Sequence, residues 1–364
     1  MLELQEQLEK VWKLRQPFVA YHLPQASEVK CMIPHDSKLN YLQHYDEAGF
    51  IFKPFKTSSQ PIVFHEANSS VFKYELIDTP KVTESKFSIK DDLREEYLNL
   101  LRAAIETIKT GKAKKIVVSR VISAAYDLQS PFGLLMKLIK NYPTAFTYVW
   151  FHPDFGLWAG ASPELFAKTY RNRLETMALA GTKKAKETRA WTVKEETEQQ
   201  IVTDDILKVL MKYADKVDVA ERKTEQAGEL LHLRTDLKAN FEPKSLGRIL
   251  EELHPTPAVC GLPKNPAYQF LLENEGYNRQ FYTGFLGELN SNVQTQRSSR
   301  TKNQENQAYK SIAKASHLFV NLRCLSYSEG KLNIYVGGGI TKDSVPEDEW
   351  EETVNKSRTM LKVL

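Results

Sequence analysis

Residues 335–356 combine three consecutive glycines with two carboxylates and an amine at helical spacing. The glycines occupy positions 337–339, and Glu349, Glu352 and Lys356 follow at intervals of three and four residues. Such intervals place all three side chains on one helical face. A solvated face with ion pairs is the common meaning of this charge pattern. A glycine run at the end of a strand, however, indicates that a ligand approaches the backbone closely.

An anionic ligand could bind beside these carboxylates only if a cation lay between them. Amide groups of a glycine run bind carboxylate or phosphate groups, which nearby glutamates would repel. A Mg²⁺ ion held by few carboxylates, by water and by the anion itself removes this conflict. The pattern therefore predicts a magnesium site next to an anion site.

A second acidic cluster, Glu195, Glu196 and Glu198, opens a predicted helix over residues 193–214. Acidic residues are common in a first helical turn because they interact favourably with the helix dipole, and the spacing alone favours this interpretation. In the alternative interpretation, Glu198 supplies a further ligand for the same Mg²⁺ ion.

Glu164 and Lys115 are a candidate acid and base. Glu164 follows a Ser-Pro pair between two strand-like segments, where burial would raise the pKa of its carboxyl group and suit it to proton donation. The same residues also suit a helix start. Lys115 shares one face of a predicted strand with Val117 and Ser119. A desolvated lysine can act as a base, although a strand-end lysine that reaches water is commoner.

His254 lies in the segment HPTPAVCGLPK, whose prolines restrict the backbone. The sequence therefore predicts a histidine held in a rigid loop. A single histidine is weak evidence for a functional site, so an ordinary structural loop is the competing interpretation.

The elements that must position these residues follow from hydrophobic periodicity. Residues 91–111 have apolar side chains at helical spacing and end at Gly111, a typical C-terminal cap. We expect residues 1–90 to form a helix and several short strands. Further helices are expected at 131–143, 193–214, 245–254, 266–275 and 343–364. Strands are expected at 114–123, 144–152, 156–161, 281–289, 317–327 and 331–339.

Two local features complete the predicted secondary structure. Ser344 should cap the last helix, with Glu347 closing a capping box. Residues 290–316 are polar and lie between apolar strands, so we expect an exposed surface loop in which a helix could form toward the end.

Composition and charge exclude some classes of protein. The chain has 364 residues, a formal net charge of +4 and no apolar run of about 20 residues, so neither a nucleic-acid footprint nor a membrane span is expected. The N-terminus lacks the apolar centre of a signal peptide. Three widely spaced cysteines imply neither a disulfide framework nor a cysteine metal site, and favour a cytoplasmic location. We expect one catalytic domain over residues 1–364, with 1–90 as its N-terminal part.

Several motifs together resemble those of the chorismate-utilising enzymes. They are KIVVSR, GASPELF, LAGT, EQQIVTDD, HPTPAVCGLP, FYTGFLGE, NLRC and GGGITKDSVPEDEWEETVNK, in the family's order. The resemblance runs from about residue 91 to the C-terminus and excludes the polar loop. It implies an α+β fold with large, mostly antiparallel sheets packed as a sandwich and helices outside. The site would lie in a cleft between the sheets.

Within this family the motifs are most similar to those of isochorismate synthases, which implies an isomerase that converts chorismate to isochorismate with Mg²⁺. By motif, Lys115 matches the base that activates water, and Glu164 matches the acid that protonates the departing ring hydroxyl. Glu198 and Glu352 match Mg²⁺ ligands, and Glu349 a ligand acting through water. The implied substrate-binding residues are Gly181, Thr182, His254, Tyr282, Arg323, Gly337, Gly339 and Lys356.

Departures from related subfamilies narrow the implied activity. Aminodeoxychorismate synthases carry a nucleophilic lysine where this chain has Ala180, and anthranilate synthases lack a lysine equivalent to Lys115 and differ at the proline loop. The resemblance thus disfavours ammonia-using chemistry and a glutaminase subunit. A salicylate synthase and a catalytically silent chorismate-binding subunit are the alternatives. The implied state is a monomer, and the pathway could be menaquinone or siderophore biosynthesis.

Overall fold

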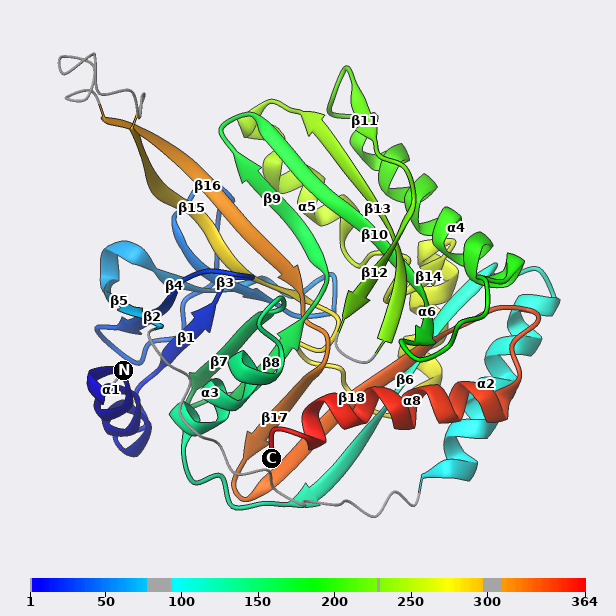
Figure 1. The fold of residues 1–364 in the computed structure, drawn as a ribbon, viewed down its shortest axis with the longest axis horizontal. Coiled ribbons are helices and arrows are strands. Elements are labelled where there is room, and N and C mark those ends of the chain that lie inside the picture. Colours follow the sequence, from blue (N-terminus) through cyan, green and yellow to red (C-terminus); the bar gives the residue numbers. More distant parts are fainter. Residues whose placement is uncertain (1, 77–92, 228–229, 297–309) are drawn as a thin grey trace.

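The computed structural model describes residues 2–76, 93–227, 230–296 and 310–364. Within them, two nine-stranded sheets pack face to face, with helices on the outside (Figure 1). Every strand pair recorded in these sheets is antiparallel. The predicted α+β sandwich is confirmed.

The first sheet, sheet A, carries both the proposed base and the glycine run. In spatial order its strands are β14 (Gly261–Leu262), β6 (Lys115–Ala125), β18 (Lys331–Ile340), β17 (Cys324–Ser328), β8 (Gly156–Ser162), β7 (Phe146–His152), β1 (Phe18–His22), β2 (Glu28–Pro34) and β5 (Ser69–Glu75).

The second sheet, sheet B, includes two further strands from the N-terminal region. Its order is β11 (Val217–Val219), β13 (Leu230–Asn240), β10 (Arg173–Lys184), β9 (Leu165–Tyr170), β16 (Lys310–Val320), β15 (Phe285–Gln296), β3 (Gly49–Lys53) and β4 (Ile62–His65). A ninth strand, β12 (Lys223–Ala227), also pairs with β13. Residues 18–75 thus contribute strands to both sheets.

Aromatic side chains fill the space between the sheets. Along β7, Phe146, Tyr148 and Trp150 point into this inner core, while Val149 and Phe151 point to the outer face. Both faces of the strand are therefore buried, and the apolar run shows little alternation in the sequence. Phe52 of sheet B meets Trp150 and Trp158 of sheet A edge to face.

Helices cover the outer faces. Apolar clusters unite α1 (Leu2–Lys13) and α3 (Pro131–Asn141) with sheet A, and α4 (Val193–Leu210) and α5 (Leu246–Leu253) with sheet B. The β6–β18 end of sheet A packs against α2 (Arg94–Lys109), α6 (Lys264–Asn274) and the start of α8 (Pro346–Leu361). None of the described helices is long and apolar enough to cross a membrane.

The strand predicted over residues 317–327 is wrong, because the chain changes sheets there. Strand β16 ends at Val320 in sheet B, and β17 begins at Cys324 in sheet A. Arg323, in the connection between the two strands, has a φ of 48°, in the left-handed region that few non-glycine residues adopt. The continuous apolar pattern conceals this crossing, since the residues on both sides of it are buried.

The polar loop predicted over residues 290–316 is also wrong in part. Strands β15 and β16 continue as an antiparallel ladder from Ser291 opposite Ala315 to Gln296 opposite Lys310. Backbone hydrogen bonds form this ladder whatever the side chains are, so polar composition does not exclude it. The rest of the predicted loop, 297–309, lies outside the described residues.

The capping box predicted for the last helix is not formed. The helix starts at Pro346, its N-cap residue is Val345, and no side chain caps it. The Ser344 hydroxyl instead accepts a hydrogen bond from the amide of Thr341. Proline in the first turn has no amide hydrogen to satisfy, which reduces the need for a cap.

Candidate active site

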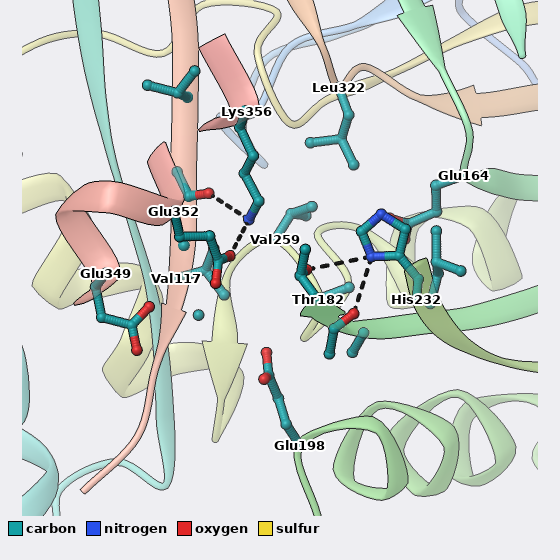
Figure 2. Close-up of a pocket in the computed structure, with 18 of the residues that line it drawn as sticks. Val117, Glu164, Thr182, Glu198, His232, Val259, Leu322, Glu349, Glu352 and Lys356 are labelled. Atoms are coloured by element: carbon teal, nitrogen blue, oxygen red, sulfur yellow. Dashed lines mark hydrogen bonds and ion pairs between the residues drawn. The ribbon is translucent and has the colours of Figure 1, made fainter. Parts of the chain in front are cut away.

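A cavity of about 380 Å³ lies where β18 and α8 meet α4, β10 and β13 (Figure 2). This volume lies within the range of small-molecule sites. Most of the predicted site residues line the cavity: Glu164, Gly181, Thr182, Glu198, Tyr282, Arg323, Gly337, Gly339, Glu349, Glu352 and Lys356.

The three glycines of β18 leave room for polar side chains on both faces of the strand. A Cβ atom at Gly339 would lie 2.4 Å from Glu198 Oε1 and 2.9 Å from Lys115 Cε. At Gly338 it would lie 3.4 Å from Glu349 Oε2 and 3.9 Å from an oxygen of Glu352. The glycines therefore allow carboxylates from α4 and α8 to approach the strand.

The same glycines present backbone groups to the cavity. Strand β6 pairs with one edge of β18 as far as Ile340, whereas β17 pairs with the other edge only up to Ile334. The Gly337 carbonyl points to this open edge, where it accepts a hydrogen bond of 2.9 Å from Lys356 Nζ. In an antiparallel ladder one residue's N–H and C=O point to the same side, alternating along the strand. The amides of Gly337 and Gly339 therefore face the open edge.

Three carboxylates from two distant helices line this part of the cavity. Glu349 and Glu352 lie one turn apart on α8, and Glu198 reaches the cavity from α4 on the opposite side (Figure 2). Burial and the neighbouring Glu352 raise the pKa of Glu349. Burial raises the pKa of Glu352, but the Lys356 ammonium, together with His232 and Lys194, lowers it by more, so the net pKa of that carboxyl group is lowered.

Each of these carboxylates pairs with a lysine. Lys115 Nζ lies 2.8 Å from Glu198, Lys194 Nζ 3.0 Å from Glu349, and Lys356 Nζ 2.5 Å from Glu352. Lys194, at the start of α4, was not anticipated from the sequence. One of these carboxylates is buried and two are half-buried, and negative charges this close together need such counter-ions.

The donors fit Mg²⁺ in their chemistry, because the ion prefers carboxylate oxygens, takes few protein ligands and keeps several waters. The glycine cradle of β18 supports this fit, since a side chain at Gly339 would displace Glu198. In the described residues no group of three or more His, Cys, Asp or Glu side chains is already arranged around one metal position. To bind a metal ion, the three glutamate side chains would thus have to turn away from their lysine partners and toward the ion.

Lys115 and Glu164 are both buried, at 0% and 3% exposure. Burial raises the pKa of Glu164 to about 8, and the nearby positive charge of Lys115 opposes this rise. Glu164 sits between β8 and β9, so it is part of neither ladder and projects into the cavity. Lys115 does not line the cavity, but it forms an ion pair with Glu198, which does. The helix start considered for Glu164 is absent.

A bulge in β10 shapes the opposite wall. The register with β13 shifts between Ala180 and Thr182, and Gly181 has a φ of 71°, which favours glycine. His232 of β13 lies beside this bulge, with Nδ1 3.0 Å from the Gly181 carbonyl and 3.3 Å from Thr182 Oγ1 (Figure 2).

His232 is a site residue that the sequence analysis missed. Burial lowers its pKa to about 3, so the ring is neutral, and its Nε2 has no described partner. With Nδ1–H donating to Gly181, Nε2 is an acceptor available to a ligand hydroxyl. Residues 233, 235 and 237 of β13 (Leu, Thr and Leu) are buried and alternate with charged residues in the sequence. This alternation is the signal that could have identified the strand.

Arg323 and Tyr282 form the end of the cavity near Gly337. The Arg323 guanidinium has no hydrogen bond or ion pair with any described residue, although it is largely enclosed by the protein. A Cβ atom at Gly337 would lie 3.0 Å from the Tyr282 hydroxyl. An unpaired guanidinium next to outward-facing amides is suited to bind a carboxylate.

His254 lies outside the cavity, contrary to expectation. It ends α5 and is 3% exposed, and its Nε2 donates to the carbonyls of Pro54 or Phe55 at 3.0 and 3.1 Å. Burial lowers its pKa to about 3. These contacts fit the structural interpretation of this histidine, which fastens the proline-rich loop to sheet B.

The acidic residues of α4 do not all have the same role: two fit the helix-start interpretation and one fits the metal-ligand interpretation. Glu195 forms a capping box with Thr192 and an ion pair of 2.7 Å with Arg189, as expected for a helix start. Glu196 pairs with Arg222 at 3.4 Å. Glu198, one turn further along, points into the cavity.

Fold and cavity together define a small-molecule site lined by carboxylate, lysine and arginine side chains. A model of the chorismate binding enzyme family matches residues 56–304, and a second model with the same description matches residues 307–362. The chain therefore belongs to the chorismate binding enzyme family.

Curated relatives at modest identity include several isochorismate synthases. MenF of Escherichia coli (strain K12) is 26% identical over 283 residues, which cover 73% of this chain and 60% of MenF. EntC of the same strain is 28% identical over 276 residues, 72% of this chain and 65% of EntC. Component 1 of anthranilate synthase from Lactococcus lactis is 25% identical over 295 residues, 77% of this chain and 59% of the relative. The chain thus matches less than two thirds of the length of these proteins.

Solved structures share the fold. The structure of DhbC from Bacillus anthracis has a TM-score of 0.77 at 22% identity and covers 99% of both chains. The structure of MenF, the menaquinone-specific isochorismate synthase from Escherichia coli, has a TM-score of 0.73 at 19% identity, covering 95% of this chain and 88% of MenF.

Proposed function

We propose that this protein is a Mg²⁺-dependent isochorismate synthase, an isomerase that interconverts chorismate and isochorismate. The observation that carries the proposal is the buried pair of Glu164 and Lys115 beside a carboxylate-rich cavity. The pKa of Glu164, about 8, leaves its carboxyl group protonated at neutral pH and able to donate. The relatives named isochorismate synthase support the same reaction.

The proposed reaction moves a hydroxyl group from one ring carbon to another. Lys115, in its neutral form, accepts a proton from a water molecule whose oxygen attacks the ring carbon next to the carboxylate-bearing one. The ring double bonds shift, and the bond to the original hydroxyl breaks. Glu164 donates a proton to this departing group, which leaves as water. One water is consumed and one released, so return of the proton from Lys115 to Glu164 restores the enzyme.

Glu198 and Glu352 would hold the Mg²⁺ ion, with Glu349 acting through water. When bound, the ion would neutralise the ring carboxylate and draw electron density toward it. Their present partners, Lys115 and Lys356, would then be released from the carboxylates. For Lys115 this release is useful, because an ion pair with Glu198 keeps the proton on the amine, whereas only the neutral amine can accept a proton from water.

The second carboxylate of the substrate, on the enolpyruvyl group, would bind at the other end of the cavity. The unpaired guanidinium of Arg323, the outward-facing amides of Gly337 and Gly339, and the Tyr282 hydroxyl supply donors there. Thr182 and His232 would contact the ring on its hydroxyl side, and Lys356 would add a positive charge once released from Glu352. His254 is not included, since it lies outside the cavity.

The test is incubation of the purified protein with chorismate and MgCl₂, followed by chromatographic separation of products. Isochorismate alone supports the proposal. Salicylate with pyruvate would identify the second candidate, a salicylate synthase. Tight chorismate binding without turnover would indicate a silent binding subunit. Either of the last two results contradicts the proposal.

Other parts of the proposal concern the whole chain. We infer one catalytic domain over residues 1–364, a monomer without a glutaminase subunit, and a cytoplasmic location. All three cysteines are buried and unpaired, which suits a reducing compartment. Lys115 and Ala180 support water rather than ammonia as the nucleophile, in accordance with the resemblance described above.

A further inference from the structure

A second, larger cavity of about 1200 Å³ adjoins the candidate active site. We call it the vestibule; it lies between the β9–β10 face of sheet B, the residues after β1, and the last turns of α8. The two cavities share four lining residues, which form the wall between them: Pro163, Leu179, His232 and Arg323. The side chains of these four residues therefore separate a molecule in the vestibule from the active-site cavity.

The vestibule has a strongly positive lining. Its described lining residues include six lysines and arginines and a single acidic residue, Glu225. Glu225 is itself paired with Arg234 at 3.4 Å. Lys168, Lys186 and Arg358 are exposed, and their charged side-chain groups form no hydrogen bond or ion pair with another described residue. These three charges are thus available to attract an anion.

The active-site cavity opens to solvent in a different place and with a different charge. Its exposed lining residues are Arg189, Thr192 and Asp348, at the starts of α4 and α8. Arg189 is held by Glu195, and the carboxylate groups of Glu198 and Glu349 lie behind this opening. Four carboxylates line this end of the cavity against two cations, Arg189 and Lys194, so it attracts a dianion less than the vestibule does.

The wall between the cavities presents groups suited to a polar anionic ligand. Arg323 lines both cavities, and its guanidinium has no described partner. His232 also lines both, and its buried Nε2 lacks a hydrogen-bond partner. Leu179 and Pro163 complete the wall with apolar surface.

We infer that the vestibule is the route by which the dianionic substrate enters the active site, with Arg323 as the first partner that it meets inside. This inference rests on the proposed function, because it assumes a substrate with two carboxylates. A cleft of one charge focuses the field and raises association rates by about 10- to 1000-fold for an opposite charge. Substrate and metal ion thus have separate entrances of opposite charge.

The first experiment measures association of chorismate by stopped-flow tryptophan fluorescence in the presence of MgCl₂. A triple variant, Lys168→Gln/Lys186→Gln/Arg358→Gln, should lower the association rate about tenfold at low ionic strength. The dissociation rate and kcat should stay within about twofold, because no changed residue contacts bound substrate. The difference should disappear near 1 M salt, where the Debye length is about 3 Å.

The matched control is Arg102→Gln/Lys109→Gln/Lys112→Gln, which removes the same charge from exposed positions on and after α2 that line neither cavity. It should leave the association rate within about twofold. An equal drop in the control would mean that net charge alone matters, and an unchanged rate in the vestibule variant would mean that substrate enters elsewhere. Either result overturns the inference.

A second experiment tests the route rather than the charge. The native cysteines are all buried, so a Lys168→Cys variant can be labelled selectively with a bulky maleimide. Labelling should slow chorismate association at least fivefold, whereas the same label on a Lys112→Cys variant should not. Equal rates before and after labelling at position 168 would contradict the inference. Failure of the unmodified protein to bind chorismate would refute the proposed function as well.

Discussion

At the scale of single residues, the proposed chemistry depends on where Glu164 is placed. A glutamate in water is ionised at neutral pH, but burial between β8 and β9 raises the pKa of Glu164 to about 8. Lys115 limits the rise, since its positive charge favours the ionised form. The pKa of the proposed acid is thus set by burial and by the charge of the proposed base.

Substitution of Glu164 by Gln should abolish most turnover while preserving binding. Glutamine has the same shape as the protonated acid but cannot donate a proton to the departing hydroxyl group. We expect kcat to fall about 10²- to 10⁴-fold, the usual contribution of general acid catalysis, with the dissociation constant for chorismate changed less than about threefold. Steady-state kinetics and equilibrium titration measure the two quantities. A near-normal kcat would remove Glu164 from its proposed role.

The raised pKa of Glu164 also predicts a dependence of stability on pH. The folded-state pKa of about 8 exceeds the ordinary value of 4.5, so this residue's contribution is complete below pH 4.5 and is lost as the pH rises toward 8. Relative to the Glu164→Gln variant, the wild type should therefore lose stability across this window, by at most about 1.4 kcal/mol per pH unit. Denaturant unfolding of both proteins from pH 5 to 8.5 measures the difference. A difference that is constant with pH would show that the carboxyl group is not perturbed.

At the scale of elements, β18 is the part of the fold that brings the carboxylates together. It pairs with β6 along ten residues and so positions Lys115 opposite its own C-terminal end. Because Gly337–Gly339 have no side chains, α8 on one side and α4 on the other can direct carboxylates toward the same strand. These two helices are far apart in the sequence, so their carboxylates meet only when both sheets of the sandwich have formed.

Gly339→Ala should therefore damage the site more than the fold. Its Cβ atom would lie 2.4 Å from Glu198 Oε1, so this carboxylate and the neighbouring Lys115 must move. We expect Mg²⁺ affinity and kcat/KM to fall at least tenfold, with the melting temperature within a few degrees of the wild type. Gly133→Ala, on helix α3, is the control, since its nearest contacts are 3.3 and 3.4 Å from the Ser130 side chain. Calorimetric titration with MgCl₂ measures the affinity; unchanged binding in Gly339→Ala would argue against Glu198 as a ligand.

At the scale of the whole molecule, the aromatic core and the proposed metal site are spatially separated. The aromatic core between the sheets, which includes Phe52, Trp150 and Trp158, contains none of the proposed Mg²⁺ ligands, and Tyr282 is one of its contacts with the substrate site. The three carboxylates of the site are balanced by lysines, which supply counter-charge without a metal ion. The fold should therefore persist when the metal ion is removed.

Chelation provides the corresponding test. EDTA should stop the conversion of chorismate, and excess MgCl₂ should restore it, because the lysines cannot replace the ion's interaction with the ring carboxylate. Far-UV circular dichroism and the melting temperature should change little in EDTA. Turnover that continues after exhaustive chelation would refute the metal site, whereas loss of secondary structure would contradict the separation of core and site.

The sequence alone determined the elements and motifs that are local. Helical spacing put Glu349, Glu352 and Lys356 on one face of α8, and the glycine run marked a close approach to β18, because both signals lie within one element. The α+β class and the family's motif order were likewise readable. Local patterns, however, could not separate Glu198 from the helix-capping Glu195, since both are acidic residues at the start of one helix.

Only the tertiary structure decided which distant residues meet. It brought His232 rather than His254 into the cavity. Strand β13 pairs with β10, so His232 of β13 lies beside the bulge at Gly181 and contacts its carbonyl. His254 binds backbone carbonyls outside the cavity. It also divided the apolar segment around Arg323 between two sheets, which turned that guanidinium toward both cavities. Burial and charge depend on contacts between segments far apart in the chain, so the raised pKa of Glu164 and the positive vestibule exist only in the folded molecule.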